Sequence, residues 1–258
     1  MSSTDATRLG AVQRALTVLE VVARHGGASA KEVAEASGLP LPTVYRLAGE
    51  LIAGDYLVHI KDEKRFELGY KLHQLGVSLH QQIGVPRLVR QEITALHQAT
   101  GTAAYLAIHR GAQIVVVFVA DAPACPRLRP MEFGFHEAPH ATAFGKILLS
   151  NMSDEQRRLH LGPGELPAFT PATIVDRGAL AEQLAQVADS GIAWEHGEFL
   201  RGSTCAAAVV RGESGVLIGS VAVSAPHARF RRGRKALEQH LRTTASRVSR
   251  FYRSGRTA

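Results

Sequence analysis

Residues 136–140 spell His-Glu-x-x-His, the string with which zinc hydrolases supply two imidazole ligands and a general base. This chemistry requires the two histidines to lie one turn apart on an unbroken helix. Pro139 stands between them, and a proline inside a helix removes a backbone hydrogen bond and costs about 3 kcal/mol. It also pushes Ala138 toward an extended conformation. The sequence therefore predicts a loop at this string and no metal site.

Other catalytic signatures are absent from the sequence. It contains no G-x-S-x-G string, no phosphate-binding P-loop and no G-x-G-x-x-G string. The two cysteines, Cys125 and Cys205, have no metal-ligand spacing. We therefore expect no enzyme activity, no cofactor and two reduced thiols.

The composition is that of an ordinary globular chain. Of the 258 residues, 45% are hydrophobic and 21% are charged, which suits one large domain or two smaller ones. The longest apolar runs, such as 114–120 and 204–210, fall short of the roughly 20 residues that cross a bilayer. Residues 1–10 are polar and lack the plan of a secretory signal. We therefore expect a cytoplasmic protein without a membrane partner.

The net charge of +7 is concentrated at one end of the chain. Residues 229–258 hold ten Lys or Arg and one acid, whereas residues 1–69 hold eight Lys or Arg and nine acids. The overall charge therefore says nothing about DNA binding by the N-terminal region. The basic tail also has apolar residues at helical spacing, which predicts a docked helix with a solvated basic face. These residues are Leu237, Leu241, Ala245, Val248 and Tyr252.

Three short helices are predicted over residues 11–24, 29–38 and 42–54, from apolar spacing and from a capping box formed by Ser29 and Glu32. Strand-like segments follow at 56–60 and 65–69, on either side of a polar turn. We expect their buried face to consist of Val58, Ile60, Phe66 and Leu68. This order is typical of a winged helix-turn-helix, in which the third helix enters the major groove of DNA. A small α/β domain for protein contacts is the alternative.

A further helix is predicted over residues 70–83, with Leu72, Leu75, Leu79 and Ile83 on one stripe. An apolar stripe must be buried. Pairing with a second subunit would bury it and would set the distance between two DNA-reading heads. Packing on the chain's own C-terminal domain is the alternative.

The remaining residues predict an α+β sheet domain large enough to enclose a small molecule. Its expected strands are 102–109, 113–120, 131–135, a strand near 192, 204–210 and 216–224. Its expected helices lie near 86–101, 141–150, 153–161 and 176–190.

Several stretches resemble motifs of the isocitrate-lyase-regulator (IclR) family of bacterial transcription factors, in the family's order. In the N-terminal region they are RALTVLE (14–20), EVAEASGLP (32–40), TVYRL (43–47) and GDYL (54–57). In the C-terminal region they are HATAFGKILL (140–149), GIA (191–193), Glu198, CAA (205–207) and SVAVSAP (220–226). The resemblance implies a winged helix-turn-helix domain over 1–69, a linker helix over 70–85 and a GAF-like effector-binding domain over 86–258 that ends in a helix. It also implies homodimers or homotetramers that bind a double-stranded operator.

The resemblance places DNA contacts at Thr43, Tyr45 and Arg46 on the third helix, where hydroxyl and guanidinium groups suit phosphates and base edges. Tyr45 is alternatively a core residue. Family members often have a polar or basic residue and a serine before this threonine, whereas this chain has Leu41 and Pro42. Two possible hydrogen bonds to DNA are therefore missing, and the resemblance does not specify which bases this chain reads. On the wing, we expect phosphate contacts from Lys61, Lys64 and Arg65. The alternative is that these three side chains are exposed charges that contact only water.

Free amides at the start of the helix near residue 141 would suit the carboxylate of a small organic acid. The resemblance assigns effector contacts to His140 in the same motif and to the backbone of Ala143 and Phe144. It also assigns side-chain contacts with the effector and an apolar wall of the effector site. The alternative for the wall residues is that they are ordinary core residues. These residues are Glu195, Cys205 and Ser224 for the contacts, and Met131 and Phe133 for the wall.

Together these features predict a transcriptional regulator, more specifically a repressor, that a small carboxylic acid controls. The alternatives are a small-molecule enzyme with an appended helical domain, and a constitutive DNA-binding oligomer whose C-terminal domain senses nothing. The sequence specifies neither the effector nor the target genes.

Overall fold

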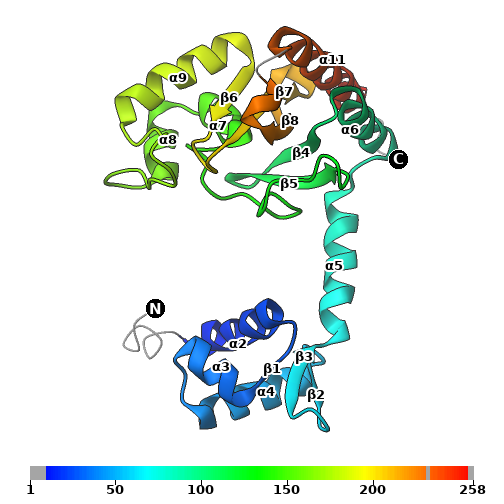
Figure 1. Cartoon of the computed structure of the whole chain (residues 1–258), viewed down its shortest axis with the longest axis vertical. Helices are drawn as coiled ribbons and strands as arrows, with labels where there is room; N and C mark the ends of the chain where they lie inside the picture. Colours follow the sequence, from blue (N-terminus) through cyan, green and yellow to red (C-terminus); the bar gives the residue numbers. More distant parts are fainter. Residues whose placement is uncertain (1–9, 231–232, 255–258) are drawn as a thin grey trace. The chain divides into compact units, whose positions relative to one another are not determined.

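The computed structural model describes residues 10–230 and 233–254, and the chain divides into two compact units, Met1–Gly84 and Val85–Ala258 (Figure 1). Both units mix helices with an antiparallel sheet, so the predicted α+β class is confirmed. Among the described residues no helix combines the length and the apolar character needed to span a membrane.

The first unit is a winged helix-turn-helix. Its elements are α2 (Ala11–His25), β1 (Ala28–Ser29), α3 (Ala30–Ser37), α4 (Leu41–Ala53), β2 (Leu57–Ile60), β3 (Arg65–Leu68) and α5 (Tyr70–Ile83). The predicted capping box starts α3, because the Ser29 hydroxyl accepts from the Glu32 amide and the Glu32 carboxylate accepts from the Ser29 amide. Apolar side chains of α2, α3 and α4 form one core with Leu57 and Phe66 of the hairpin.

The predicted buried face of the hairpin is confirmed for Phe66 on β3 and is wrong on β2. Leu57 pairs with Leu68 and His59 pairs with Phe66, so these four side chains share one face. Val58 and Ile60 lie on the other face, opposite Glu67 and Arg65. Leu57 and Phe66 are buried, whereas Leu68 is 46% exposed. The prediction began its alternation at Val58, one residue late on β2, which moves every side chain of that strand to the wrong face.

Helix α5 has no buried residue. Its apolar residues Leu75, Val77 and Leu79 are exposed, and Tyr70 at its start is 84% exposed. Leu72 and Ile83, the other two residues of the predicted stripe, are half-buried. The described residues of the first unit therefore leave Leu75 and Leu79 of the stripe uncovered.

The second unit is a five-stranded antiparallel sheet with helices on both faces. Strands β4 (Ala103–Arg110), β5 (Gln113–Ala120), β6 (Ile192–His196), β7 (Ser203–Arg211) and β8 (Leu217–Pro226) lie in the order β5-β4-β8-β7-β6. Helices α6 (Arg87–Thr100) and α11 (Arg234–Arg253) pack on one face, and α7 (Ala143–Ser150) packs on the other. The remaining elements are α8 (Asp154–Leu161), α9 (Arg177–Ser190), the short 3-10 helix η1 (Glu213–Gly215) and α10 (His227–Phe230).

One predicted strand of this unit is absent. Residues 131–135 form turns rather than a strand. They are held to β5 by two backbone bonds, in which the Val116 amide donates to Phe135 and the Gly134 amide donates to Val116. Gly134 has a φ of 92°, which is incompatible with the extended backbone of a strand, so the pairing with β5 does not continue beyond those two bonds. The tail helix is docked as predicted, with Leu237, Leu241, Ala245 and Val248 buried.

Candidate functional site

Helix α4 presents one polar face to solvent. Val44, Leu47, Ala48 and Leu51 are buried in the core of the first unit. On the opposite side Tyr45 is 58% exposed and Arg46 is exposed, while Thr43 is half-buried. The core-packing alternative for Tyr45 is therefore wrong, and all three side chains remain available on the helix that a winged helix-turn-helix places in DNA.

The wing offers fewer free cations than expected. The Arg65 guanidinium lies 2.9 Å from the Glu63 carboxylate and makes a second, shorter bond to Glu67. Lys61 and Lys64 are exposed and have no ion pair within residues 10–230 and 233–254. The two lysines are therefore the better candidates for phosphate contact, since Arg65 already has two anionic partners.

In the second unit the sheet register brings together three side chains that lie far apart in the sequence. Glu195 on β6 pairs with Cys205 on β7, and Cys205 pairs with Ser224 on β8. Paired residues share a face, so the three side chains form one row across the sheet. Cys205 packs with Phe144 of α7 in the same buried core, which places the row beneath that helix. All three residues are at most 4% exposed.

Glu195 is a buried acid with one satisfied and one unsatisfied oxygen. Its Oε1 accepts from the backbone amides of Glu198 and Phe199, the latter at 3.0 Å. Its Oε2 is buried and has no partner among the described residues. Burial raises the pKa of Glu195, against the lowering effect of the two amide bonds. Burial, reinforced by Glu195, likewise raises the pKa of Cys205. A protonated Glu195 would present an O–H donor at Oε2.

Helix α7 begins two residues later than predicted. The Ala141 amide donates to Ala138, and the first helical residue is Ala143, after Thr142 as N-cap. The amides without an intrahelical acceptor are therefore those of Ala143, Phe144 and Gly145 rather than those of 141–144. The Pro139 backbone covers one side of this turn, because a Cβ on Gly145 would lie 2.4 Å from the Pro139 Cα.

A buried ion pair that sequence reasoning missed joins α7 to the segment after β6. Lys146 is fully buried, and its Nζ lies 2.5 Å from Glu198 Oε1. Glu198 Oε2 is buried without a partner among the described residues. Burial lowers the pKa of Lys146, and Glu198 opposes that shift. The sequence signal was the single lysine in the otherwise apolar run 143–149.

Aromatic rings line the region beside this pair. Phe135 contacts Phe144 and Phe199, with ring centroids 5.8 and 5.4 Å apart, and Phe169 contacts Phe199 and His140. Met131 is buried in the same core, and Phe133 is half-buried. Sequence reasoning missed Phe135, Phe169 and Phe199, together with Tyr105, whose hydroxyl lies 2.7 Å from that of Ser224.

The His-Glu-x-x-His string is not helical. His136 Nδ1 lies 2.7 Å from the Gly134 carbonyl, and His140 Nε2 lies 2.9 Å from the Pro167 carbonyl. Within the part of the chain that the structure describes, no three His, Cys, Asp or Glu side chains gather to hold a metal ion. Burial lowers the pKa of His140, so the ring is neutral near pH 7 and donates to Pro167.

Comparison with known protein families finds two models of the same family, one for each end of the chain. The "IclR helix-turn-helix domain" matches residues 11–60, and "Bacterial transcriptional regulator IclR C-terminal" matches residues 78–250. The chain is 26% identical over 231 residues to the HTH-type transcriptional regulator BhcR of Paracoccus denitrificans, covering 89% of this chain and 82% of BhcR. It is 24% identical over 242 residues to the HTH-type transcriptional repressor AllR of Escherichia coli K12, covering 93% and 89%.

Among solved structures, the fold is similar to that of an IclR homolog from Microbacterium hydrocarbonoxydans in complex with 4-hydroxybenzoate. The TM-score is 0.77 at 20% identity, and the match covers 95% of this chain and all of that one.

Proposed function

The chain belongs to the IclR family of bacterial transcriptional regulators, and we propose that it is a repressor whose binding to operator DNA is controlled by a small organic acid. The observation that carries the proposal is the buried row Glu195, Cys205 and Ser224 beneath the first turn of α7. The similar AllR proteins of Salmonella and Escherichia coli are named as repressors, which supports the direction of control.

An aromatic carboxylic acid is the effector class that this site fits best. The free amides of Ala143 and Phe144 favour an anionic group because they lie at the positive end of a helix dipole. Phe144 and Met131 share one buried core and would provide the apolar wall that a ring contacts, whereas Phe133 is half-buried. The bound 4-hydroxybenzoate of the Microbacterium protein is a carboxylate of this class.

The direct test measures DNA binding with and without acids. The full chain is incubated with duplexes from the DNA upstream of its own gene at a stated salt concentration. We expect binding that one acid from a panel of small carboxylates changes, and the same acid should raise the melting temperature. DNA binding without any stabilising acid would instead identify a constitutive DNA-binding protein.

Effector binding should depend on pH through Glu195. A direct hydrogen bond between Glu195 Oε2 and a ligand carboxylate requires the protonated form of Glu195, whose pKa is raised above its ordinary value of 4.5. The affinity for the acid is therefore highest below that raised pKa and falls about tenfold per pH unit above it.

The Glu195→Gln variant retains Oε1 and carries an N–H donor in place of Oε2. Calorimetric titration with the acid should give an affinity that changes little with pH over the range in which the wild-type affinity falls. Equal pH slopes for both proteins would contradict the assigned role of Glu195.

We further propose that the exposed face of α5 pairs two copies of the chain. Leu75 and Leu79 are exposed one turn apart, and burial of a leucine contributes about 1.5–3 kcal/mol. The double variant Leu75→Glu with Leu79→Glu should sediment as a smaller species than the wild type. Gln74→Glu with Gln81→Glu adds the same charge at polar positions and should leave the assembly unchanged. Identical sedimentation of all three proteins would exclude α5 from the interface.

A further inference from the structure

Charge is distributed unevenly between the two compact units. Residues 1–84 hold nine Lys or Arg and nine Asp or Glu, so the unit that contains α4 has no net charge. Residues 229–258 hold ten Lys or Arg and one acid, Glu238. Neutralisation of phosphates supplies much of the affinity of proteins for DNA. A DNA-binding unit without net charge therefore binds a duplex weakly by itself. Six of these cations and Glu238 lie on α11.

Helix α11 has two distinct faces. The inner face packs on α6, β7 and β8 and buries Leu237, Leu241 and Val248. The outer face consists of exposed residues spaced three or four apart, which places them on one side of the helix. These residues, called here the outer α11 face, are Lys235, Gln239, Arg242, Ser246, Arg250 and Arg253. The face extends over about 27 Å at 1.5 Å per residue.

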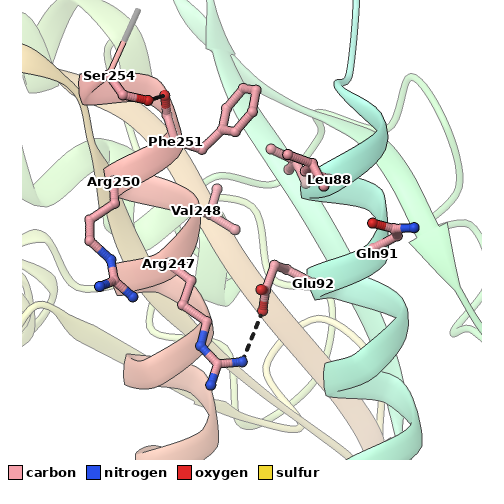
Figure 2. A pocket seen from close by; sticks show the side chains of 9 residues that line it. Leu88, Gln91, Glu92, Arg247, Val248, Arg250, Phe251 and Ser254 are labelled. Carbon is pink, nitrogen blue, oxygen red and sulfur yellow. Dashed lines mark hydrogen bonds and ion pairs between the residues drawn. The ribbon is translucent and has the colours of Figure 1, made fainter. Parts of the chain in front are cut away.

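The acids near α11 are already paired with cations outside this face. Glu238 lies 3.2 Å from Arg234 and also accepts from the Trp194 indole at 2.9 Å. Glu92 of α6 lies 3.3 Å from Arg247. Figure 2 shows Arg247 reaching toward Glu92, whereas Arg250 is directed away from α6.

The cations of the outer α11 face lack such partners. Lys235, Arg250 and Arg253 are exposed and have no ion pair within residues 10–230 and 233–254. Arg242 donates to the backbone carbonyl of Ser190, which is uncharged. Four positive charges therefore follow one side of a helix that its buried inner face holds rigidly.

We propose that the outer α11 face is a second DNA-contact surface, which binds backbone phosphates and reads no sequence. Between the cations lie Gln239 and Ser246, which can donate hydrogen bonds to phosphate oxygens. The face has no aromatic or aliphatic anchor of the kind on which protein interfaces centre. Its chemistry therefore fits a polyphosphate better than an acidic protein. The proposal rests on the DNA-binding part of the proposed function.

The test removes the three unpaired charges from the full chain. The variant combines Lys235→Gln, Arg250→Gln and Arg253→Gln, which keeps good helix formers on α11. The observed binding constants for an operator duplex and for a random duplex are measured across a salt series. Since each phosphate contact contributes about 0.9 to the slope of log K against log salt, the slope should fall by roughly 2–3 for each subunit that contacts the duplex, with both duplexes. The ratio of operator to random affinity should stay the same.

A matched variant combines Arg129→Gln, Arg158→Gln and Arg201→Gln, which are exposed in the second unit outside α11. It removes the same charge and should leave the wild-type slope nearly unchanged. Equal slopes for the two triple variants would overturn the proposal. Unchanged DNA binding with lost binding to polyglutamate would also overturn it, because the face would then be assigned to an acidic polypeptide. Failure of the proposed function is distinguishable, since it would appear as an absence of operator preference in the wild type.

Discussion

Replacement of Arg46 with alanine is expected to weaken operator binding about thirtyfold or more without affecting the fold. Arg46 is exposed on α4 and has no ion pair in the described ranges. A bidentate contact of arginine with a base is worth about 1–3 kcal/mol, and a dimer would lose two of them. The loss of about 2–6 kcal/mol should appear in the Kd for the operator duplex, measured by fluorescence anisotropy at fixed salt.

Two variants separate base reading from simple loss of charge. Arg24→Ala removes one exposed positive charge from the end of α2 and should change the Kd only slightly. Arg46→Lys keeps the charge but loses the planar fork, so it should retain binding to random duplexes and lose preference for the operator. An Arg46→Ala protein that binds the operator as well as Arg24→Ala does would exclude α4 as the reading helix.

Local signals were sufficient to predict most of the helices. The Ser29 and Glu32 pair marks the start of α3, and Gly26, Gly38 and Gly101 end helices in the left-handed conformation that glycine adopts easily. The same local logic excluded a metal-binding helix at Pro139. These features depend on residues within one or two turns of each other, which the sequence displays directly.

The buried faces of short strands were harder to predict. Side chains of a strand alternate between its two faces, so an error of one residue exchanges the buried and the exposed face. In β2 the buried residue is Leu57, and an alternation that starts at Val58 inverts the whole strand. Residues 131–135 show the related difficulty: their apolar composition suits a strand, but only two backbone bonds tie them to β5. Whether such a segment becomes a strand depends on neighbours distant in the sequence.

The residues of the candidate effector site were predicted from the family resemblance and could not be predicted from composition or spacing. Glu195, Cys205 and Ser224 share a row only because β6, β7 and β8 adopt one particular register. No spacing rule relates these three positions, and the family resemblance supplied them. Lys146 and Glu198 both lie in or beside motifs that resemble the family, yet their pairing became visible only in the folded chain.

Replacement of Lys146 with methionine is expected to destabilise the second unit by about 3–5 kcal/mol. The change leaves the Glu198 carboxylate buried without its cation, and an uncompensated buried charge is costly. Trp194 is the single tryptophan and lies in this unit, so its fluorescence reports the unfolding of this unit in urea. The midpoint for Lys146→Met should fall clearly below that of the wild type. Lys235→Met makes the same chemical change at an exposed position and should leave the midpoint nearly unchanged.

Removal of both charges distinguishes an ion pair from a simple packing role. In the double variant Lys146→Met with Glu198→Leu no buried charge remains, and apolar replacement of a buried pair is often neutral or stabilising. The double variant should therefore recover most of the stability that the single variant loses. If Lys146→Met unfolds at the wild-type midpoint, the contact between Lys146 and Glu198 contributes nothing to the stability of the second unit. The first turn of α7 would then be held over the Glu195 row by packing alone, with no contribution from an ion pair.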